Sequence, residues 1–153
     1  MSETFLSVIP TDPDWQPDQA AGDGSAALLN ELCPRAGGEI EVRWHTLPAF
    51  VNSGADLETI SCPRCGSRLD IREWWMPQMD GAYDGAGFSN LDIRMPCCDF
   101  HTTLNDLVYD RPCGFARFEI KILDPDRAEL NSDELSAISD KLGHDVRQVW
   151  ARI

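Results

Sequence analysis

Two pairs of cysteines are the residues of this sequence best suited to bind a metal ion. Cys62 and Cys65 stand two residues apart in a Cys-Pro-Arg-Cys-Gly segment, and Cys97 and Cys98 are adjacent in Met-Pro-Cys-Cys. Two thiolates at such a turn can bind one zinc ion, because the turn directs both sulfurs to the same side. The glycine after Cys65 permits the tight turn. We therefore predict zinc as the cofactor.

The second half of the site leaves a choice of ligands. Cys97 with Cys98 would give four thiolates, whereas Cys98 with His101 would give three thiolates and one imidazole. We favour Cys62, Cys65, Cys97 and Cys98 as ligands, with His101 as the alternative. Four protein ligands leave no open position for water, so they indicate a structural zinc ion and not a catalytic one.

Two other interpretations of the cysteines remain open at this point. The thiols could all be free in a reducing compartment, or Cys62 and Cys65 could form a redox pair. A redox pair normally begins a helix, whereas Gly66 and Ser67 favour a turn. Cys33 lies on an apolar helical stripe and Cys113 lies between Pro112 and Gly114, so both are expected to be small buried or loop residues.

Alternation and helical spacing predict the elements that must position these cysteines. A strand–helix–strand unit is predicted near each end of the chain. The predicted elements are a strand at 5–9, a helix from about 23 to 33, strands at 39–45 and 116–122, a helix at 132–142 with its N-cap at Asn131, and a strand at 146–153.

This order of elements predicts an α+β fold, a ferredoxin-like split βαβ sandwich, with residues 46–113 inserted between the second and third strands. The chain is then a single domain, 1–153, whose sandwich halves are 1–45 and 114–153. Alternating segments at 57–61, 68–75 and 91–95 flank the cysteine pairs, which is typical of a zinc ribbon. Trp74 and Trp75 would point to opposite faces of such a strand.

Several segments together resemble a group of uncharacterised small bacterial zinc-ribbon proteins. They are FLSVIPTDP, CPRCG, MPCC, TLNDL and GFARFEI. The resemblance implies that Cys97 and Cys98 are ligands and that His101 is a bystander. It implies no established activity. An ATPase label found on some members is not supported, because the sequence lacks the glycine-rich phosphate-binding motif.

The net charge of the chain indicates which kind of partner to expect. The 153 residues carry 13 Lys plus Arg against 26 Asp plus Glu, a net charge of −13. No segment is basic, so nucleic acid is an unlikely partner, and a protein with a basic surface is the expected one. The sequence shows neither a signal peptide nor an apolar run that could span a membrane. We therefore expect a cytoplasmic protein.

Catalytic motifs are missing from the sequence, and its three histidines, His45, His101 and His144, have no evident partner. We therefore expect a non-catalytic protein-binding module, and one concrete form is an immunity or inhibitor protein that covers a basic partner. The alternatives are a nucleic-acid-binding zinc-ribbon protein and an enzyme. An enzyme would need a deep pocket with convergent acids near His45 or His101.

Overall fold

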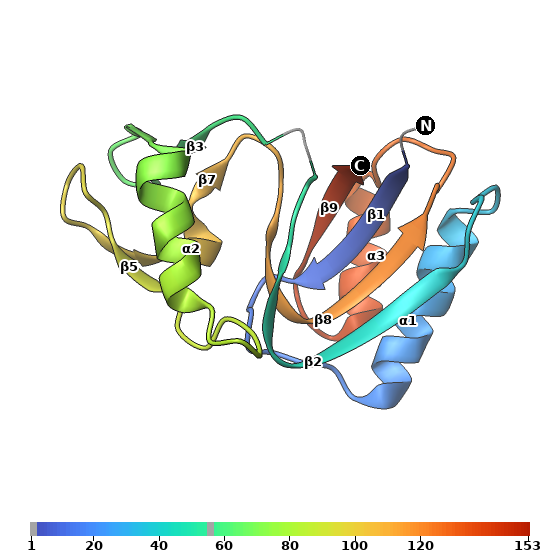
Figure 1. The fold of residues 1–153 in the computed structure, drawn as a ribbon. Coiled ribbons are helices and arrows are strands. Elements are labelled where there is room, and N and C mark those ends of the chain that lie inside the picture. The colour runs from blue at the N-terminus through green and yellow to red at the C-terminus, as the bar shows by residue number, and fades with distance from the viewer. Residues whose placement is uncertain (1–2, 55–56) are drawn as a thin grey trace.

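A four-stranded sheet with two helices forms the larger part of the molecule (Figure 1). The computed structural model describes residues 3–54 and 57–153. The elements of this part are β1 (Thr4–Pro10), α1 (Gln19–Leu32), β2 (Ile40–Val51), β8 (Gly114–Leu123), α3 (Ser132–Leu142) and β9 (Val146–Arg152). Their order confirms the predicted α+β class and the two strand–helix–strand units.

The strands of this main sheet are all antiparallel and lie in the order β2-β8-β1-β9. Val8 of β1 and Val42 of β2 both pair with Ile120 of β8, from its two sides. The two chain ends are held side by side, because Glu3 and Ile153 exchange backbone hydrogen bonds of 2.9 Å. Strands β8 and β1 are the two interior strands of the main sheet, and β2 and β9 are its edges.

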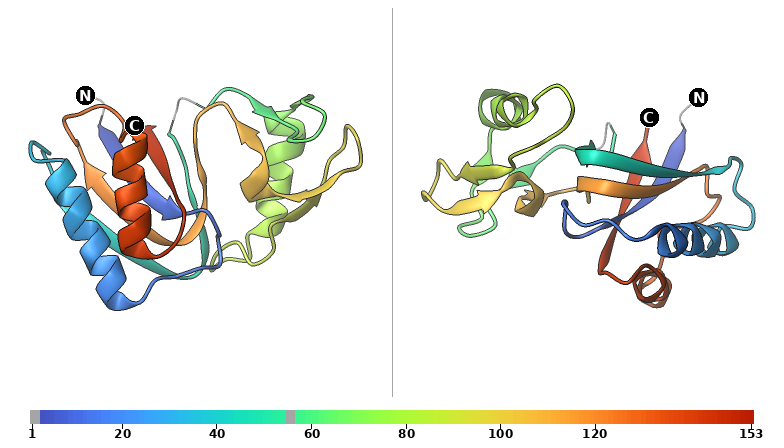
Figure 2. Two further views of the ribbon diagram at one scale, coloured as in Figure 1. Left: turned by 180° about the vertical axis from the view of Figure 1, so that it is seen from behind. Right: turned by 90° about the horizontal axis from the view of Figure 1, so that it is seen from below.

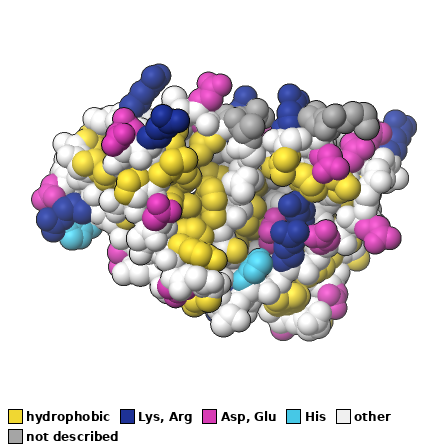
Figure 3. All heavy atoms as spheres, viewed as in Figure 1, with side chains coloured by type: hydrophobic (Ala, Val, Ile, Leu, Met, Phe, Trp, Pro, Cys, Tyr) yellow, Lys and Arg dark blue, Asp and Glu magenta, His cyan; other side chains and the backbone are white. Residues whose placement is uncertain are grey.

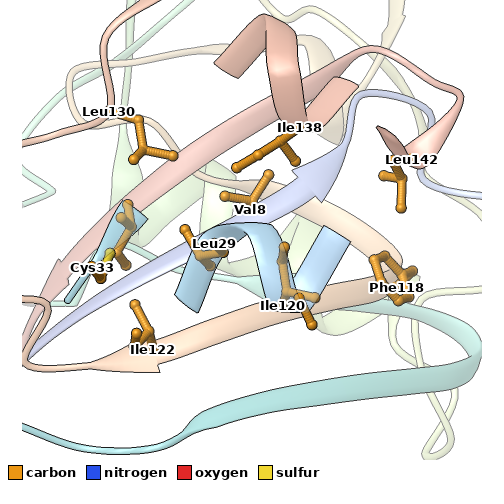
Figure 4. Packing of buried hydrophobic residues seen from close by; sticks show 11 residues of the cluster. Val8, Leu29, Cys33, Phe118, Ile120, Ile122, Leu130, Ile138 and Leu142 are labelled. Carbon is orange, nitrogen blue, oxygen red and sulfur yellow. The ribbon is translucent and has the colours of Figure 1, made fainter. Parts of the chain in front are cut away.

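Helices α1 and α3 cover one face of the main sheet (Figure 2). The core between helices and sheet is apolar and fully buried (Figure 4), which is the main source of stability for such a layer. Its members are Leu6, Val8, Ala26, Leu29, Cys33, Phe118, Ile120, Ile122, Leu130, Ile138 and Leu142.

Helix α1 packs closely against the edge of the sheet at Gly22. A side chain at this position would meet the Trp44 ring at 2.8 Å, so only glycine allows the ring to lie against the helix. The Trp44 ring in turn packs edge-on against Phe118, with ring centres 4.8 Å apart. Trp44 nevertheless stays 37% exposed.

The ends of the helices follow from their capping residues. Asn131 and Glu134 form a reciprocal capping box at the start of α3, and Gly143 ends the helix with a positive φ of 88°, as predicted. Helix α1 begins earlier than predicted, at Gln19, because the Asp18 side chain accepts a 2.7 Å hydrogen bond from the Ala21 backbone N–H and caps the helix there.

Strands β2 and β8 continue beyond the helices into a second, smaller part of the molecule (Figure 1). Strand β2 is longer than the predicted 39–45 because pairing resumes after an irregularity between Trp44 and Ala49. Pro48 lies in this irregular stretch, where a missing backbone N–H is tolerated. The far end of β2, Val51, pairs with Gly114 of β8.

Residues 57–109, which we call the cysteine lobe, form this smaller part. Its short strands are β3 (Ile60–Ser61), β4 (Arg68–Leu69), β5 (Asp92–Arg94), β6 (His101–Thr103) and β7 (Val108–Tyr109). They form a β4-β3-β7 sheet and a β5-β6 pair. Phe115 of β8 belongs to the lobe's apolar core, whose other buried members are Ile60, Cys62, Leu69, Trp75, Leu91, Ile93, Met95, Leu104 and Leu107.

A helical segment replaces the predicted strand after Leu69. One π-helical turn (Ile71–Trp75) leads directly into α2 (Met76–Ala82). The Asp70 side chain starts it by accepting a 2.7 Å hydrogen bond from the Glu73 backbone N–H, and Pro77 is tolerated in the first turn of α2. In this conformation Trp75 is buried and Trp74 is half-buried, and both pack on the lobe core.

The face of the main sheet opposite α1 and α3 carries no helix among the described residues (Figure 2). Figure 3 shows hydrophobic side chains gathered in the middle of the view, where the cysteine lobe meets the main sheet, with charged side chains of both signs around them. Glu119 is buried on the helix-free face, and the Ser7 hydroxyl donates a 2.5 Å hydrogen bond to its carboxylate. The described helices are all too short or too polar to serve as a membrane span.

Candidate metal centre

Two hairpin turns of the cysteine lobe carry the four cysteines. The first turn joins β3 to β4 and holds Cys62 and Cys65. The second joins β5 to β6 and holds Cys97 and Cys98. Each cysteine pair therefore lies where an antiparallel strand pair reverses direction. The alternating segments at 57–61, 68–75 and 91–95 indicate such turns, although the strand after the second pair, β6, was not predicted.

The two turns share one backbone design. In the first, Cys62 N–H donates to the Ser67 carbonyl at 2.9 Å, and Gly66 N–H donates to the Cys62 carbonyl at 3.1 Å. In the second, Met95 N–H donates to the Phe100 carbonyl at 2.8 Å, and Asp99 N–H donates to the Met95 carbonyl at 3.0 Å. Gly66 and Asp99 both have positive φ, 76° and 61°.

This equivalence explains the adjacent cysteine pair. Met95 occupies the backbone position of Cys62, and Cys98 occupies that of Cys65. The Met95 side chain is buried in the lobe core, 1% exposed, so the second turn has no thiol at its first position. Cys97, one residue before Cys98, supplies the missing sulfur.

The four sulfur atoms form one compact group. All four Sγ atoms lie within 4.8 Å of one another. Individual Sγ–Sγ distances are 3.3 Å for Cys65 and Cys97, 3.7 Å for Cys62 and Cys98, and 4.0 Å for Cys97 and Cys98. Ligands 2.3 Å from a tetrahedral ion would be about 3.8 Å apart. The group is therefore of the right size to hold a metal ion such as zinc.

The thiols of this group differ in acidity. The pKa of Cys65 is lowered to about 6, first by its hydrogen bond with the Ser67 hydroxyl, then by the Ser67 backbone N–H and by Cys97. The pKa of Cys97 is raised to about 12, first by partial desolvation and then by sharing its proton with Cys65 and Cys62. Without a metal ion, the sulfurs therefore share protons unequally.

The group lies at the surface of the lobe, with one side against the lobe core. Cys62 is buried, whereas Cys65 and Cys97 are exposed. The guanidinium of Arg64 lies over the Phe100 ring, 5.3 Å from its centre, and this contact joins the two turns. An ion bound here would link the two hairpins of the lobe.

His101 lies in β6, beyond the second turn, and is not a member of the sulfur group. Its Nε2 accepts a 3.1 Å hydrogen bond from Arg94 Nε. Arg94 also contacts Asp99, at 3.3 Å. The imidazole is therefore held on the outer side of the second hairpin by polar neighbours.

The remaining cysteines are small buried residues, as predicted. Cys33 is 2% exposed in the core under the main sheet, and Cys113, the residue just before β8, is 1% exposed. Burial raises the pKa of Cys33, and it raises that of Cys113 to about 12. Both thiols are therefore protonated at neutral pH and unsuited to metal binding.

A polar cleft between the main sheet and the cysteine lobe was not predicted. It measures about 490 Å³ and is lined by residues of the β1–α1 loop and of the lobe. Four carboxylates line it, from Asp12, Asp14, Asp92 and Asp106, and none of the three histidines does. Asp12 and Asp14 are far from Asp92 and Asp106 in the sequence, so no local pattern could reveal the cleft.

Comparison of the chain with known proteins gives no relative. No family model matches it, and no curated protein and no solved structure matches it. The resemblance to small bacterial zinc-ribbon proteins therefore rests on the sequence motifs alone, and no family is identified.

Proposed function

We propose that the chain is a zinc protein in which Cys62, Cys65, Cys97 and Cys98 hold one structural ion. The observation that carries this proposal is the grouping of the four Sγ atoms within 4.8 Å. In this proposal the cysteine lobe is a zinc ribbon, with two hairpins that each supply two ligands. The zinc ribbon is inserted into a ferredoxin-like sandwich. The strand order β2-β8-β1-β9 and the repeated strand–helix–strand unit support this part of the proposal.

The donor set favours zinc and a structural role. Four thiolates at tetrahedral spacing are typical ligands of structural zinc sites, which keep no position open for substrate or water. The small lobe has strands of only two or three residues, so a metal ion would supply much of its folding free energy.

Metal content and ligand identity can be measured together. Purified protein is expected to contain about one zinc ion per chain. Cys62→Ser and Cys98→Ser should each reduce zinc retention at least about tenfold, because a hydroxyl is a poor substitute for a thiolate. Inductively coupled plasma mass spectrometry on the folded, gel-filtered proteins measures this.

Three variants control this measurement. Cys33→Ala and Cys113→Ala remove thiols outside the group and should keep the zinc ion. His101→Ala should also keep the zinc ion. If His101→Ala instead lost zinc and Cys97→Ser retained it fully, His101 and not Cys97 would be the fourth ligand. A folded wild-type protein without metal and with six titratable thiols would overturn the zinc proposal.

We further propose that the protein acts by binding another protein that has a basic surface, as an immunity or inhibitor protein does. The net charge of −13 supports this, because a strongly acidic surface accelerates association with a basic partner. The cleft lined by Asp12, Asp14, Asp92 and Asp106 offers such a partner one place where carboxylates converge from both parts of the molecule.

Binding of a cationic probe tests this second step. An immobilised arginine-rich peptide is expected to bind the protein at low salt and to release it as salt rises. Changing the four cleft aspartates to asparagine should weaken binding at least about tenfold, a loss of about 1.4 kcal/mol. Biolayer interferometry over a salt series measures this.

A variant with the same change in net charge separates the cleft from the overall charge. It carries Asp23→Asn, Glu31→Gln, Glu129→Gln and Asp140→Asn, all at exposed positions. We expect this variant to lose less affinity than the cleft variant. Equal losses would remove the cleft from the proposal, and no binding of any basic protein or peptide at low salt would contradict the basic-partner proposal itself.

A further inference from the structure

One edge of the main sheet is open. Strand β2 is the first strand in the order β2-β8-β1-β9, and within the described residues its segment 40–46 has no strand partner except β8. Farther along, the Pro48 carbonyl accepts a 2.8 Å hydrogen bond from the Phe88 backbone N–H, so the lobe covers the edge there. Figure 2 shows β2 along this edge in the view from below.

The side chains of this open segment fall into two rows. Ile40, Val42 and Trp44 lie on the side of the helices and are incompletely buried, and Trp44 is 37% exposed. Glu41 and Arg43 lie on the opposite, helix-free side. They form an exposed 2.8 Å ion pair along the strand. The edge thus presents one apolar row and one row with a charge of each sign.

We propose that this segment pairs with the same segment of a second copy of the chain, antiparallel and about a two-fold axis through Val42. In this register Val42 lies opposite Val42, and Ile40 lies opposite Trp44. Glu41 lies opposite Arg43 of the second copy, and Arg43 lies opposite its Glu41. The segment is self-complementary in both rows, which is what an interface with two-fold symmetry requires.

Neighbouring registers lack this complementarity. An axis through Glu41 would place the two Glu41 carboxylates opposite each other, and an axis through Arg43 would do the same with two guanidinium groups, and like charges directly opposite are destabilising. A shift by one position would place apolar side chains opposite charged ones. Among these registers, only the one centred on Val42 is complementary in both rows.

The existing sheet continues the charge pattern of this pairing. On β8, Lys121 lies opposite Glu41 and Glu119 lies opposite Arg43. Across the joined sheet the signs of the charges would alternate. Lys121 and Glu41 of the first copy would be followed by Arg43 and Glu119 of the second copy. Charged side chains usually protect an open edge against pairing, whereas here their order favours pairing with an identical strand.

The result would be a continuous eight-stranded sheet, independent of any metal ion. The interface between the two copies has only the area of one strand pair, so the association is reversible and depends on concentration. The net charge of −13 on each copy opposes it at low salt, and the measurement therefore belongs near 0.15 M salt, where exposed charges farther apart than about 8 Å are largely screened.

Sedimentation velocity over a range of protein concentrations tests the proposal. The full chain is expected to shift from 17.1 kDa to twice that mass as concentration rises. Glu41→Lys makes every opposed charge pair repulsive and should keep the protein monomeric over the same range. Arg43→Glu should do the same. An equimolar mixture of the two variants should associate again, because the lysine introduced in one variant would face the glutamate introduced in the other.

A matched variant and a folding check complete the experiment. Asp140→Lys makes the same change in net charge as Glu41→Lys, at an exposed position of α3, and should dimerise as the wild type does. Circular dichroism verifies folding. Arg43→Glu places a carboxylate opposite the buried Glu119, whereas Glu41→Lys places an ammonium group opposite Lys121, which is only partly buried. Glu41→Lys therefore disturbs the fold less, and it decides alone if Arg43→Glu fails to fold. A monomeric wild type, or a dimer that Glu41→Lys leaves intact, would overturn the proposal.

Discussion

Removal of the proposed zinc ion is expected to unfold the cysteine lobe while the main sheet stays folded. The lobe has only short strands around its core, and the sulfur group joins its two hairpins. Structural zinc ions contribute free energies of roughly 10 kcal/mol or more to such small units. The main sheet has its own buried core under α1 and α3, which contains none of the four sulfur ligands.

Hydrogen–deuterium exchange before and after treatment with a strong chelator measures this effect. Amides of β3, β5 and β6 should lose most of their protection, whereas those of β1 and of β8 around Ile120 should keep theirs. Re-addition of zinc should restore protection in the lobe. Equal loss of protection in both parts would show that the fold has one cooperative unit, and no loss anywhere would contradict a structural role for the ion.

Phe115→Ala is expected to lower the free energy of unfolding by about 3–5 kcal/mol, the usual cost of removing a buried phenylalanine ring. Phe115 is 0% exposed, and its ring centre lies 5.0 Å from those of both Phe50 and Phe88. The ring extends from β8 into the lobe core, so its loss leaves a cavity where the two parts of the molecule join. We expect zinc to dissociate faster from this variant.

Phe118→Ala is the matched comparison, since Phe118 is equally buried in the same strand but belongs to the core under the helices. It should cost a similar free energy in urea denaturation and leave the rate of zinc release, followed with a colorimetric chelator, near that of the wild type. Identical release rates for the two variants would mean that Phe115 does not couple β8 to the metal centre.

The main sheet and the sulfur group could be predicted because their signals are local. Alternation in 116–122 and the capping residues Asn131 and Gly143 each specify an element without reference to the rest of the chain. The two cysteine turns are equally local. The sequence shows that the cysteines of the second turn are adjacent. It does not show why they are adjacent, because the reason is that Met95 takes the backbone position of Cys62 in the folded turn.

The helical segment 71–82 has one local signal, Asp70 followed three residues later by Glu73, which is typical of a helix start, but its other residues are ambiguous. Ile71, Trp74 and Trp75 fit a helical face as well as a strand, and Pro77 resembles a helix breaker unless the helix is known to begin just before it. Tertiary packing of Trp75 against the rings of Phe50 and Tyr109 favours the helix over the strand. The aspartate cleft was also out of reach, since it exists only once the β1–α1 loop meets the lobe.

The pairing of Val51 with Gly114 has a consequence for how this architecture could change. The two points where the chain leaves and re-enters the sheet are direct cross-strand neighbours, so everything between them occupies the position of a hairpin loop. Insertions or exchanges of whole modules at this point would leave the order and the register of the four strands unchanged. The sheet can therefore serve as a constant scaffold for different inserted modules. The entropic cost of closing the loop between Val51 and Gly114 rises only with the logarithm of the loop's length.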